Sequence, residues 1–349
     1  MYKTFSYRIK DSTVAKQLHK KSCAVNYVWN FCNETQKHAL KWSKKWLTNF
    51  DLDKLVAGSS KDLGLNSTTL QDITSEYYTR RKQFKKAFLN WRSGKRSLDW
   101  IPFKSTGISF NKATGKTKYA GLAFNIWYSR PIEGIIKSGN ISQDSQGRYY
   151  LNLVCKLPDF EGPTDHRNAV GIDLGLKDVA TLSDGTHFEA PKLYRKAESE
   201  IAKAQSKKQK RKVRKLHAKV KNQRKDFNHK LSRAIVDRYS VIMIGDVCSS
   251  KLAQKRKLAK SVYDAGWYQL KTFLSYKALA KGGFAKEVDE RYTTQACSEC
   301  GCISDSSPKG VVGLSIRKWT CSECGVSHDR DINAARNILS SGRRALYRT

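Results

Sequence analysis

Four cysteines near the end of the sequence have the spacing of ligands for one metal ion. They form two Cys-x-x-Cys pairs, Cys297/Cys300 and Cys321/Cys324, with twenty residues between the pairs. Two thiolates of a pair can point at one ion, and two pairs complete the tetrahedron of a zinc ribbon. Because four thiolates leave no position for water, we expect a structural zinc ion that stabilises a segment too small for its own core. Four reduced cysteines without metal are the alternative; His328 could compete as a ligand, but we expect it to belong to the next element.

Acidic residues beside apolar or small ones form a second candidate site. Asp173 ends an apolar run that begins at Val170, between Gly171 and Gly175. A charge there is costly unless it binds something, and the glycines allow a phosphate to approach. Asp331 precedes small residues that let a helix pack closely on a sheet. Two such acids and a third could hold two Mg²⁺ ions about 4 Å apart, which would hydrolyse a phosphodiester. A turn hydrogen bond for Asp173 and a helix N-cap role for Asp331 are the alternatives.

A run of basic residues is the third candidate site. Seven of the nine residues at 207–215 are Lys or Arg, within a segment of helical period. A solvated helix face is the alternative, but without interleaved acids self-repulsion disfavours it, so we expect this helix to follow phosphates. The seven basic residues are Lys207, Lys208, Lys210, Arg211, Lys212, Arg214 and Lys215.

The overall charge supports a polyanionic partner. The 349 residues carry 66 Lys and Arg against 31 Asp and Glu, a net charge of +35. Nucleic acid relieves such self-repulsion best, and an anionic membrane surface is second, although no basic helix has a face that would insert. The sequence has no apolar stretch of membrane-spanning length and no signal-peptide core at its start, and its nine cysteines are an odd number. We therefore expect a soluble cytoplasmic protein with reduced thiols.

The pattern of apolar residues predicts the elements that must position these sites. An alternating strand at 2–9 is followed by a helical block at 11–94, whose second long helix follows Thr68 and ends at Gly94. Residues 100–158 return to strands, so one β-rich module carries a helical insertion. After a linker, the pattern predicts strands and helices in the order: strands at 170–174, 179–182 and 187–188, one long basic helix from about 191 to 237, a strand at 241–244, a helix through 267–274, a strand at 284–288, and a last helix from about 331.

Four stretches of the sequence resemble the TnpB family of transposon-encoded, RNA-guided DNA nucleases, relatives of type V CRISPR effectors and Fanzor proteins. They are GIDLGLKD at 171–178, YTTQACSECG at 292–301, WTCSECG at 319–325 and HDRDINAARNIL at 328–339. The resemblance is specific over residues 168–340, whereas the N-terminal half is similar only in layout. It implies a RuvC-type nuclease domain of RNase H fold, a guide RNA from the end of the element, and a short flanking DNA motif that the protein reads.

The resemblance assigns residues at the candidate site. Asp173 matches the first RuvC aspartate and Asp331 the last, with Asp329 the weaker choice, and the four cysteines match the family's zinc ribbon. The second RuvC motif departs from the family, because Gly245 stands where the family has glutamate. Asp246 is one residue further on and would point to the opposite face of a strand.

Two interpretations of this departure remain open. Some TnpB and Fanzor lineages resemble this pattern and supply a relocated glutamate from the strand before the zinc knuckle, which here would be Glu290. Alternatively, the site has lost a ligand and the protein only binds DNA, as nuclease-inactive TnpB-like repressors do. We favour the relocated glutamate, because clustered acids repel one another unless a metal is present. A surface glutamate paired with Arg291 or Lys286 is the structural alternative for Glu290.

The sequence therefore predicts a metal-dependent, RNA-guided DNA endonuclease with Asp173, Glu290 and Asp331 as catalytic ligands of two Mg²⁺ ions. The expected partners are a guide RNA, from the element's end or of CRISPR type, and double-stranded target DNA. We expect a monomer that associates with the nucleoid. A direct transposase that needs no RNA is a third hypothesis. The expected fold is α+β and multidomain: a β-barrel-like wedge module at 1–10 and 95–160, a helical recognition lobe at 11–94, a RuvC-like α/β domain at 165–296 and 325–349, and a zinc ribbon at 297–324.

Overall fold

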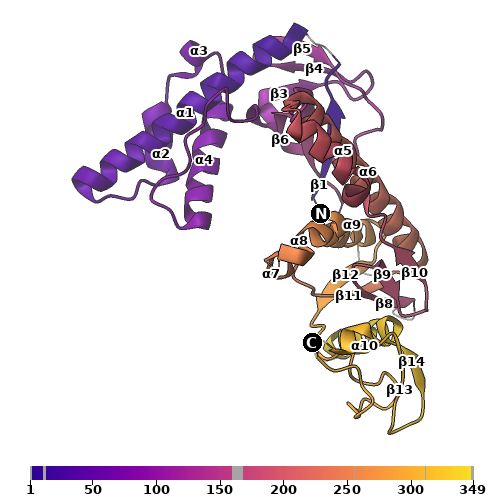
Figure 1. Cartoon of the computed structure of the whole chain (residues 1–349). Helices are drawn as coiled ribbons and strands as arrows, with labels where there is room; N and C mark the ends of the chain where they lie inside the picture. Colours follow the sequence, from indigo (N-terminus) through magenta and orange to yellow (C-terminus); the bar gives the residue numbers. More distant parts are fainter. Residues whose placement is uncertain (1, 11–12, 159–167, 255, 311, 347–349) are drawn as a thin grey trace. The chain divides into compact units, whose positions relative to one another are not determined.

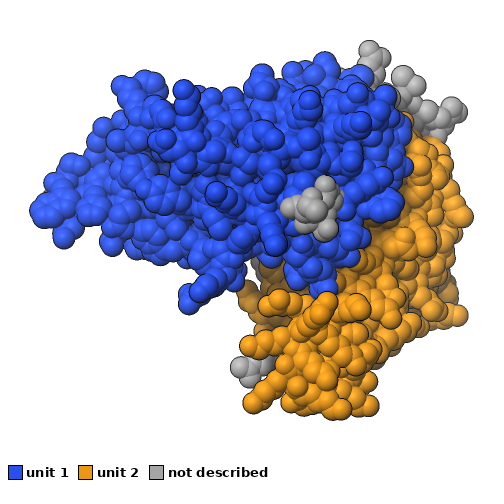
Figure 2. Space-filling model, turned by 90° about the horizontal axis from the view of Figure 1, so that it is seen from above, with its two compact units in different colours: residues 1–159 blue, residues 160–349 orange. Residues whose placement is uncertain are grey.

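The computed structural model describes residues 2–10, 13–158, 168–254, 256–310 and 312–346 (Figure 1). The chain forms two compact units, residues 1–159 and residues 160–349, which Figure 2 shows in blue and orange. The expected linker, around residues 158–167, falls at the boundary but lies almost wholly outside the described residues. Within the described chain, no helix is both long and apolar enough to cross a membrane.

Unit 1 contains two antiparallel sheets. The larger has the order β1 (Tyr2–Arg8), β7 (Tyr149–Lys156), β6 (Ile135–Gln143), β2 (Trp100–Lys104). The smaller consists of β3 (Ile108–Phe110), β4 (Lys116–Tyr119) and β5 (Leu122–Asn125), preceded by a short 3₁₀ turn at Ser105–Gly107. A bridge between Ile9 and Ile126 links the first strand to the end of β5. The first strand thus pairs with late strands, as predicted, but the described pairings form two open sheets and not one barrel.

Four helices separate β1 from β2: α1 (Thr13–Ser43), α2 (Asn49–Val56), α3 (Ser60–Leu63) and α4 (Ser67–Phe84). Their buried side chains and those of the larger sheet form one continuous core, which includes Phe5, Val28, Ile73 and Leu151. The helical insertion and the strands therefore share a hydrophobic core within unit 1.

The prediction that the second long helix runs to Gly94 is wrong. Helix α4 ends at Phe84, and Lys85 follows in the left-handed conformation with φ 52°. Phe88 and Trp91 continue the helical period but are exposed. The physical reason is a competing set of hydrogen bonds: asparagine side chains of α1 hold residues 89–92 in an irregular path.

Unit 2 is built on a five-stranded mixed sheet in the order β10 (His187–Glu189), β9 (Asp178–Leu182), β8 (Ala169–Asp173), β11 (Val241–Gly245), β12 (Phe284–Val288). Strands β8, β11 and β12 are parallel, and β9 is antiparallel to both of its neighbours. The strands predicted at 170–174, 241–244 and 284–288 form these three parallel strands.

Helices cover both faces of this sheet. On one face, α6 (Lys210–Arg238) and α9 (Trp267–Ala280) enclose a core that includes Ile235, Trp267 and Ile172. On the other face lies α10 (Arg330–Leu346), with Met243 and Ile338 at the contact. The helix approaches closely because Gly171 and Gly342 have no side chains: a Cβ at Gly171 would lie 2.0 Å from the carbonyl oxygen of Ala335.

The long basic helix predicted from about 191 to 237 is two helices, α5 (Leu193–Ser206) and α6, which pack against each other. The chain reverses at Lys208, where φ is 54°. The prediction failed because both halves keep an apolar stripe of helical period, and two such stripes are buried when the helices fold together. Between β11 and α9 lie α7 (Ser249–Ala253) and α8 (Arg256–Ala265).

The cysteine-rich segment follows β12. It contains a 3₁₀ turn at Val312–Ser315 and a hairpin of β13 (Lys318–Thr320) and β14 (Ser327–Asp329). Strand β14 runs directly into α10, so the cysteine-rich segment and this helix are joined without a linker.

Candidate functional site

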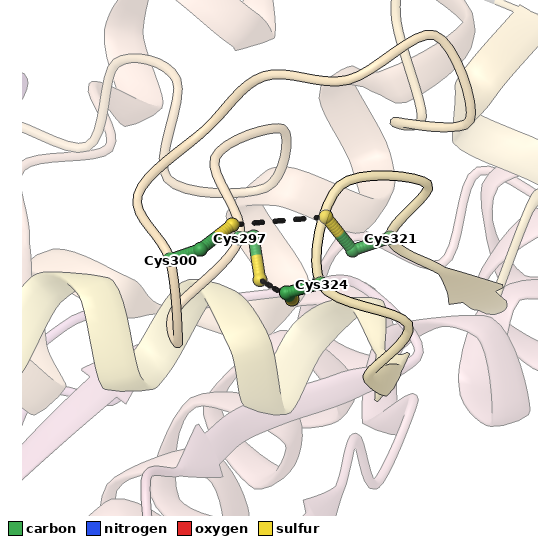
Figure 3. A group of neighbouring side chains, drawn as sticks. All are labelled: Cys297, Cys300, Cys321 and Cys324. Carbon is green, nitrogen blue, oxygen red and sulfur yellow. Dashed lines mark hydrogen bonds between the residues drawn. The ribbon is translucent and has the colours of Figure 1, made fainter.

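The four predicted cysteine ligands come together in one cluster (Figure 3). Their sulfur atoms all lie within 4.8 Å of one another. Two of the separations are 3.6 Å, between Cys297 and Cys324, and 3.8 Å, between Cys300 and Cys321. A tetrahedral zinc ion with Zn–S bonds of about 2.3 Å requires sulfur atoms about 3.8 Å apart. The cluster therefore has the dimensions of a four-thiolate metal site.

Each cysteine pair lies on the same kind of turn. A glycine follows the second cysteine of each pair, and Gly301 and Gly325 have φ of 77° and 71°. The backbone N–H of each glycine donates to the carbonyl oxygen of the first cysteine of its pair, at 2.9 Å. N–H groups of Cys324 and Glu323 lower the pKa of the Cys321 thiol, which favours its thiolate form, whereas burial and the neighbouring thiols raise the pKa of Cys324.

His328 lies in β14, as expected, beside the cluster. Its ring packs against Trp319 and its Nε2 is 3.0 Å from the sulfur of Cys297. Burial lowers the pKa of His328. A neutral imidazole N–H at this position can donate to a metal-bound thiolate, so His328 fits a supporting role beside the four sulfurs.

The strand register brings two predicted acids to the same edge of the sheet. Asp173 ends β8 directly after Ile172, which pairs with Ile244 of β11, and Gly245 of β11 pairs with Val288 of β12. Glu290 follows β12 by two residues. Burial, then the charges of Asp331 and Glu290, raise the pKa of Asp173 to about 7. The charges of all three predicted acids are therefore close enough to affect the protonation of Asp173.

Glu290 occupies the space that a side chain at position 245 would need. A Cβ built on Gly245 would lie 2.7 Å from Oε2 of Glu290 and 3.5 Å from its Cβ. The carboxyl group is half-buried, and burial together with the charge of Asp246 raises its pKa. Neither alternative partner is used: Arg291 pairs with Asp289 at 2.7 Å, and Lys286 is exposed on β12.

Asp246 has a different position from Glu290. Its side chain is exposed, and its Oδ1 accepts a hydrogen bond from the backbone N–H of Glu290 at 3.2 Å. The backbone N–H of Asp246 donates to Val288. Asp246 thus fixes the backbone that carries Glu290, and its charge also acts on the Glu290 carboxyl group.

At the start of α10, the two aspartates divide the roles that the sequence left open. Asp329 is the N-cap, because its Oδ1 accepts from the backbone N–H groups of Asp331 and Ile332 at 3.0 and 3.1 Å. The carboxylate of Asp331 instead pairs with two arginines. Arg317 lies 2.7 Å from its Oδ2, and Arg330 lies 2.8 Å from its Oδ1.

The acids are less tightly grouped than the cysteines. Within the described residues, the four cysteines are the one group of metal-binding side chains whose ligand atoms lie within 4.8 Å of one another. Burial first, and then repulsion from Asp331 and Glu290, raise the pKa of Asp173. An added divalent cation would relieve that repulsion, and the space beside Gly245 admits the Glu290 carboxylate. A metal site made of these acids would require Asp331 to exchange its two arginines for the ion.

Other contacts at the site were not expected from the sequence. Lys271 of α9 is buried, and its Nζ donates to Glu287 at 2.8 Å and to the carbonyl oxygen of Val247 at 3.2 Å. Asn333 of α10 donates to the carbonyl oxygen of Ala296 at 2.8 Å, just before the first cysteine. No spacing pattern marks Lys271, whereas the asparagine lies inside the motif at 328–339.

The seven predicted basic residues at 207–215 are all exposed, at the α5–α6 turn and the first turns of α6. Lys212 lies 3.6 Å from Glu200. Acids from distant segments that meet at one edge of a mixed sheet are typical of two-metal enzymes that act on phosphodiesters.

Comparison with known proteins agrees with this class. Residues 152–256 match a family model described as "Probable transposase", and residues 267–338 match the TNB domain of Cas12f1-like proteins. A "Putative RNA-guided DNA endonuclease" from Streptomyces pristinaespiralis is 32% identical over 85% of this chain and 75% of its own length. The "Putative RNA-guided DNA endonuclease InsQ" of Escherichia coli K12 is 31% identical over 62% of this chain and 60% of its own length. The chain belongs to the TnpB family of RNA-guided DNA endonucleases.

A solved structure also aligns along most of the chain. The Cas12f1 chain of a Cas12f1–sgRNA–target DNA complex has a TM-score of 0.40 and 12% sequence identity, and the alignment covers 98% of this chain and 100% of that chain.

Proposed function

We propose that this protein is an RNA-guided DNA endonuclease that cuts DNA beside a short flanking motif. Membership of the family supports the activity, and one observation supports an intact site. The Glu290 carboxylate lies where a side chain at Gly245 would otherwise be, with a Cβ-to-Oε2 separation of 2.7 Å. A third acid is thus available at the sheet edge, although the sequence lacks the family's glutamate in β11.

The proposed ligands of two Mg²⁺ ions are Asp173, Glu290 and Asp331. When bound, the ions would supply an activated water and stabilise the leaving oxygen. Asp173 must be ionised to bind, so its pKa of about 7 makes metal binding proton-dependent. Asp246 orients the backbone of Glu290. Arg317 and Arg330 neutralise Asp331 and, once released, are available to a phosphate.

The remaining parts have proposed roles that follow from their chemistry. The four cysteines would bind one structural zinc ion, which holds the start of α10 and hence Asp331. The basic turn at 207–215 would contact the phosphates of the guide RNA or the target DNA. The β-rich wedge module, helical lobe, nuclease domain and zinc ribbon keep the boundaries proposed from the sequence. A protein with these partners acts inside the cell.

Plasmid cleavage with a guide RNA and Mg²⁺ tests the proposal. Wild-type protein is expected to cut a plasmid that carries the target and flanking motif, whereas Asp173→Ala and Glu290→Ala do not cut. Asp246→Ala is expected to cut more slowly, because it loses only the hydrogen bond that orients Glu290.

Two outcomes would contradict parts of this proposal. Full activity of Glu290→Ala with an inactive Asp246→Ala would reject the relocated ligand. Guide-dependent DNA binding without cutting, at any Mg²⁺ or Mn²⁺ concentration, would support the repressor. Sequencing the RNA that copurifies with the protein tests the guide itself, and activity on DNA without RNA would support a direct transposase.

A further inference from the structure

Unit 1 carries two neighbouring cavities whose walls are aromatic and basic. One has a volume of about 680 Å³ and the other about 410 Å³, and Lys86 lines both. We call them together the aromatic groove. The walls of the first include Trp29, Arg80, Phe84, Trp91, Arg92 and Trp100, and those of the second include Trp46, Tyr78, Arg81, Lys82 and Lys85.

The exposed aromatic rings in the groove are held on a fixed backbone. Trp91 is 51% exposed, yet the residues around it are hydrogen-bonded to side chains of α1. The side chain of Asn33 donates to and accepts from the backbone of Leu89, and Asn30 does the same for Arg92, at 2.6–2.9 Å. These amides pair with the segment as a neighbouring strand would. Trp91 is therefore presented to solvent without the entropy cost of ordering a loop on binding.

The groove also contains cations without acidic partners. Arg81 is only 3% exposed, with its guanidinium 5.2 Å from the ring of Trp46 and 5.6 Å from that of Tyr78. Among the described residues, Nη2 of Arg81 donates to the carbonyl oxygen of Leu47, Nη1 has no hydrogen-bond partner, and no ion pair joins Arg81 to a carboxylate. A buried charge of this kind is costly until an anion approaches.

The charge of the lining is strongly one-sided. Glu76 is the acid among the lining residues, and Arg80 pairs with it at 2.7 Å. Lys82, Lys85 and Lys86 extend the positive charge along the wall. A surface that binds single strands has two components: aromatic rings on which bases stack, and cations that bind the backbone phosphates.

We propose that the aromatic groove binds unpaired nucleobases of a single-stranded nucleic acid, with Trp91 and Trp46 as stacking platforms and the surrounding cations on the backbone phosphates. The strand could come from the guide RNA or from DNA unpaired at the target, which share this chemistry. The site goes beyond the proposed nuclease function, because it lies in unit 1 and needs neither Mg²⁺ nor the acids of unit 2.

Equilibrium binding to labelled oligonucleotides tests this site with RNA-free, full-length protein in EDTA. The probes are oligo(U) RNA, oligo(dT) DNA, an abasic version of the DNA, and a duplex. Trp91→Ala and Trp46→Ala are expected to weaken single-strand binding about tenfold each, with no further loss on the abasic probe. Trp42→Ala is the matched control, because Trp42 is 75% exposed but lines neither cavity. Trp91→Phe keeps a ring and should restore binding.

The probes separate the outcomes. A loss confined to RNA supports the guide as the source, and a loss confined to DNA supports the unpaired target. The proposal is wrong if the Trp91 and Trp46 variants bind with the same affinity as Trp42→Ala. It is also wrong if their affinity for the abasic and duplex probes falls as much as their affinity for the single strands. Guided cleavage by the wild type in Mg²⁺ is a separate readout, so failure of the groove and failure of the proposed nuclease are distinguishable.

Discussion

At the scale of single residues, Gly245 and Glu290 depend on each other. The strand β11 passes through the middle of the site, and its residue 245 faces the place where the Glu290 carboxyl lies. A residue with a Cβ at position 245 and an acid at position 290 would compete for this space. In the proposed site, the missing glutamate and the added one form a single arrangement, which makes the glycine as necessary as the acid.

Gly245→Ala tests this dependence. The added methyl group would lie 2.7 Å from Oε2 of Glu290, so the carboxylate must move. A shift of about 1 Å at a catalytic group can lower activity about 100-fold, so we expect a loss of this size in the cleavage rate. The melting temperature should change little, because alanine is no worse than glycine in a strand. Cleavage at the wild-type rate would separate Glu290 from the reaction.

Asp173→Asn tests, through stability, the burial and the repulsion that together raise the pKa of Asp173. The folded protein holds a proton on Asp173 up to a pKa of about 7, whereas the unfolded chain releases it near the usual value of 3.8. The stability of the metal-free protein therefore falls as pH rises from about 4 to about 7. In EDTA, we expect Asp173→Asn to melt several degrees above the wild type at pH 8, with the difference shrinking towards pH 4.

Mg²⁺ provides the control for this measurement. The ion should raise the melting temperature of the wild type and leave that of Asp173→Asn nearly unchanged, because the variant has lost a charged ligand. A melting difference that does not vary with pH would contradict the proposed titration of Asp173.

At the scale of elements, the cysteine-rich segment and α10 form one support for two of the acids. Strand β14 continues into α10, which carries Asp331. Asn333 of the same helix donates to the carbonyl oxygens of Thr293 and Ala296, and the Thr293 hydroxyl donates to the carbonyl oxygen of Glu290 at 2.7 Å. Loss of the metal cluster should therefore displace both Asp331 and Glu290.

Cys300→Ser is the matching test, with Cys302→Ser as its control. Cys300 belongs to the cluster, whereas Cys302 is an exposed cysteine two residues away and outside it. We expect wild type and Cys302→Ser to retain about one zinc ion per chain and to cut DNA. Cys300→Ser should lose zinc, melt at a lower temperature and cut poorly. Metal analysis and cleavage of the same samples measure both effects, and full cutting by a zinc-free Cys300→Ser would show that the cluster does not support the acids.

The elements predicted correctly are those that a local pattern of apolar residues is enough to define. The strands β8 and β11 are short apolar runs buried in the sheet, whereas β12 is a partly buried edge strand. The predicted limits of all three differ from the structure by one residue or less. The end of α4 and the break between α5 and α6 were missed, because the helical period continues through both places. What ends these helices is a tertiary contact, such as Asn33 against Leu89, which a local pattern does not contain.

The candidate site was predictable to different degrees for the same reason. The cysteines and Asp173 lie in short motifs, and Glu290 followed from a resemblance together with a missing glutamate. Arg317 and Lys271 lie outside any such motif, and only the folded chain brings them to Asp331 and Glu287. Which cation pairs with an acid depends on the tertiary fold of unit 2, and the spacing of residues in the sequence does not reveal it.

At the scale of the whole molecule, the charge of +35 must be offset mainly by nucleic acid. Two positive surfaces stand out, one in each unit: the aromatic groove of unit 1 and the basic turn at 207–215 of unit 2. They differ in kind, because the groove adds rings to its cations whereas the basic turn has charge alone. The affinity of the turn for nucleic acid should therefore fall steeply as the salt concentration rises. The affinity of the groove should fall less steeply, because stacking on its rings also contributes.

The salt dependence of binding tests the basic turn. Each phosphate contact adds about 0.7 to 0.9 to the slope of log affinity against log salt. Changing Lys210, Arg211, Arg214 and Lys215 together to Gln should lower the slope by about 3 and weaken binding most at low salt. Lys230→Gln with Arg233→Gln is the control on the same helix, because Asp226 and Asp237 already pair with these cations. Fluorescence anisotropy with labelled RNA from about 50 to 200 mM salt measures the slopes. If the fourfold variant and the control give the same slope, the basic turn does not contact phosphates, and the charge that binds nucleic acid must lie elsewhere on the protein.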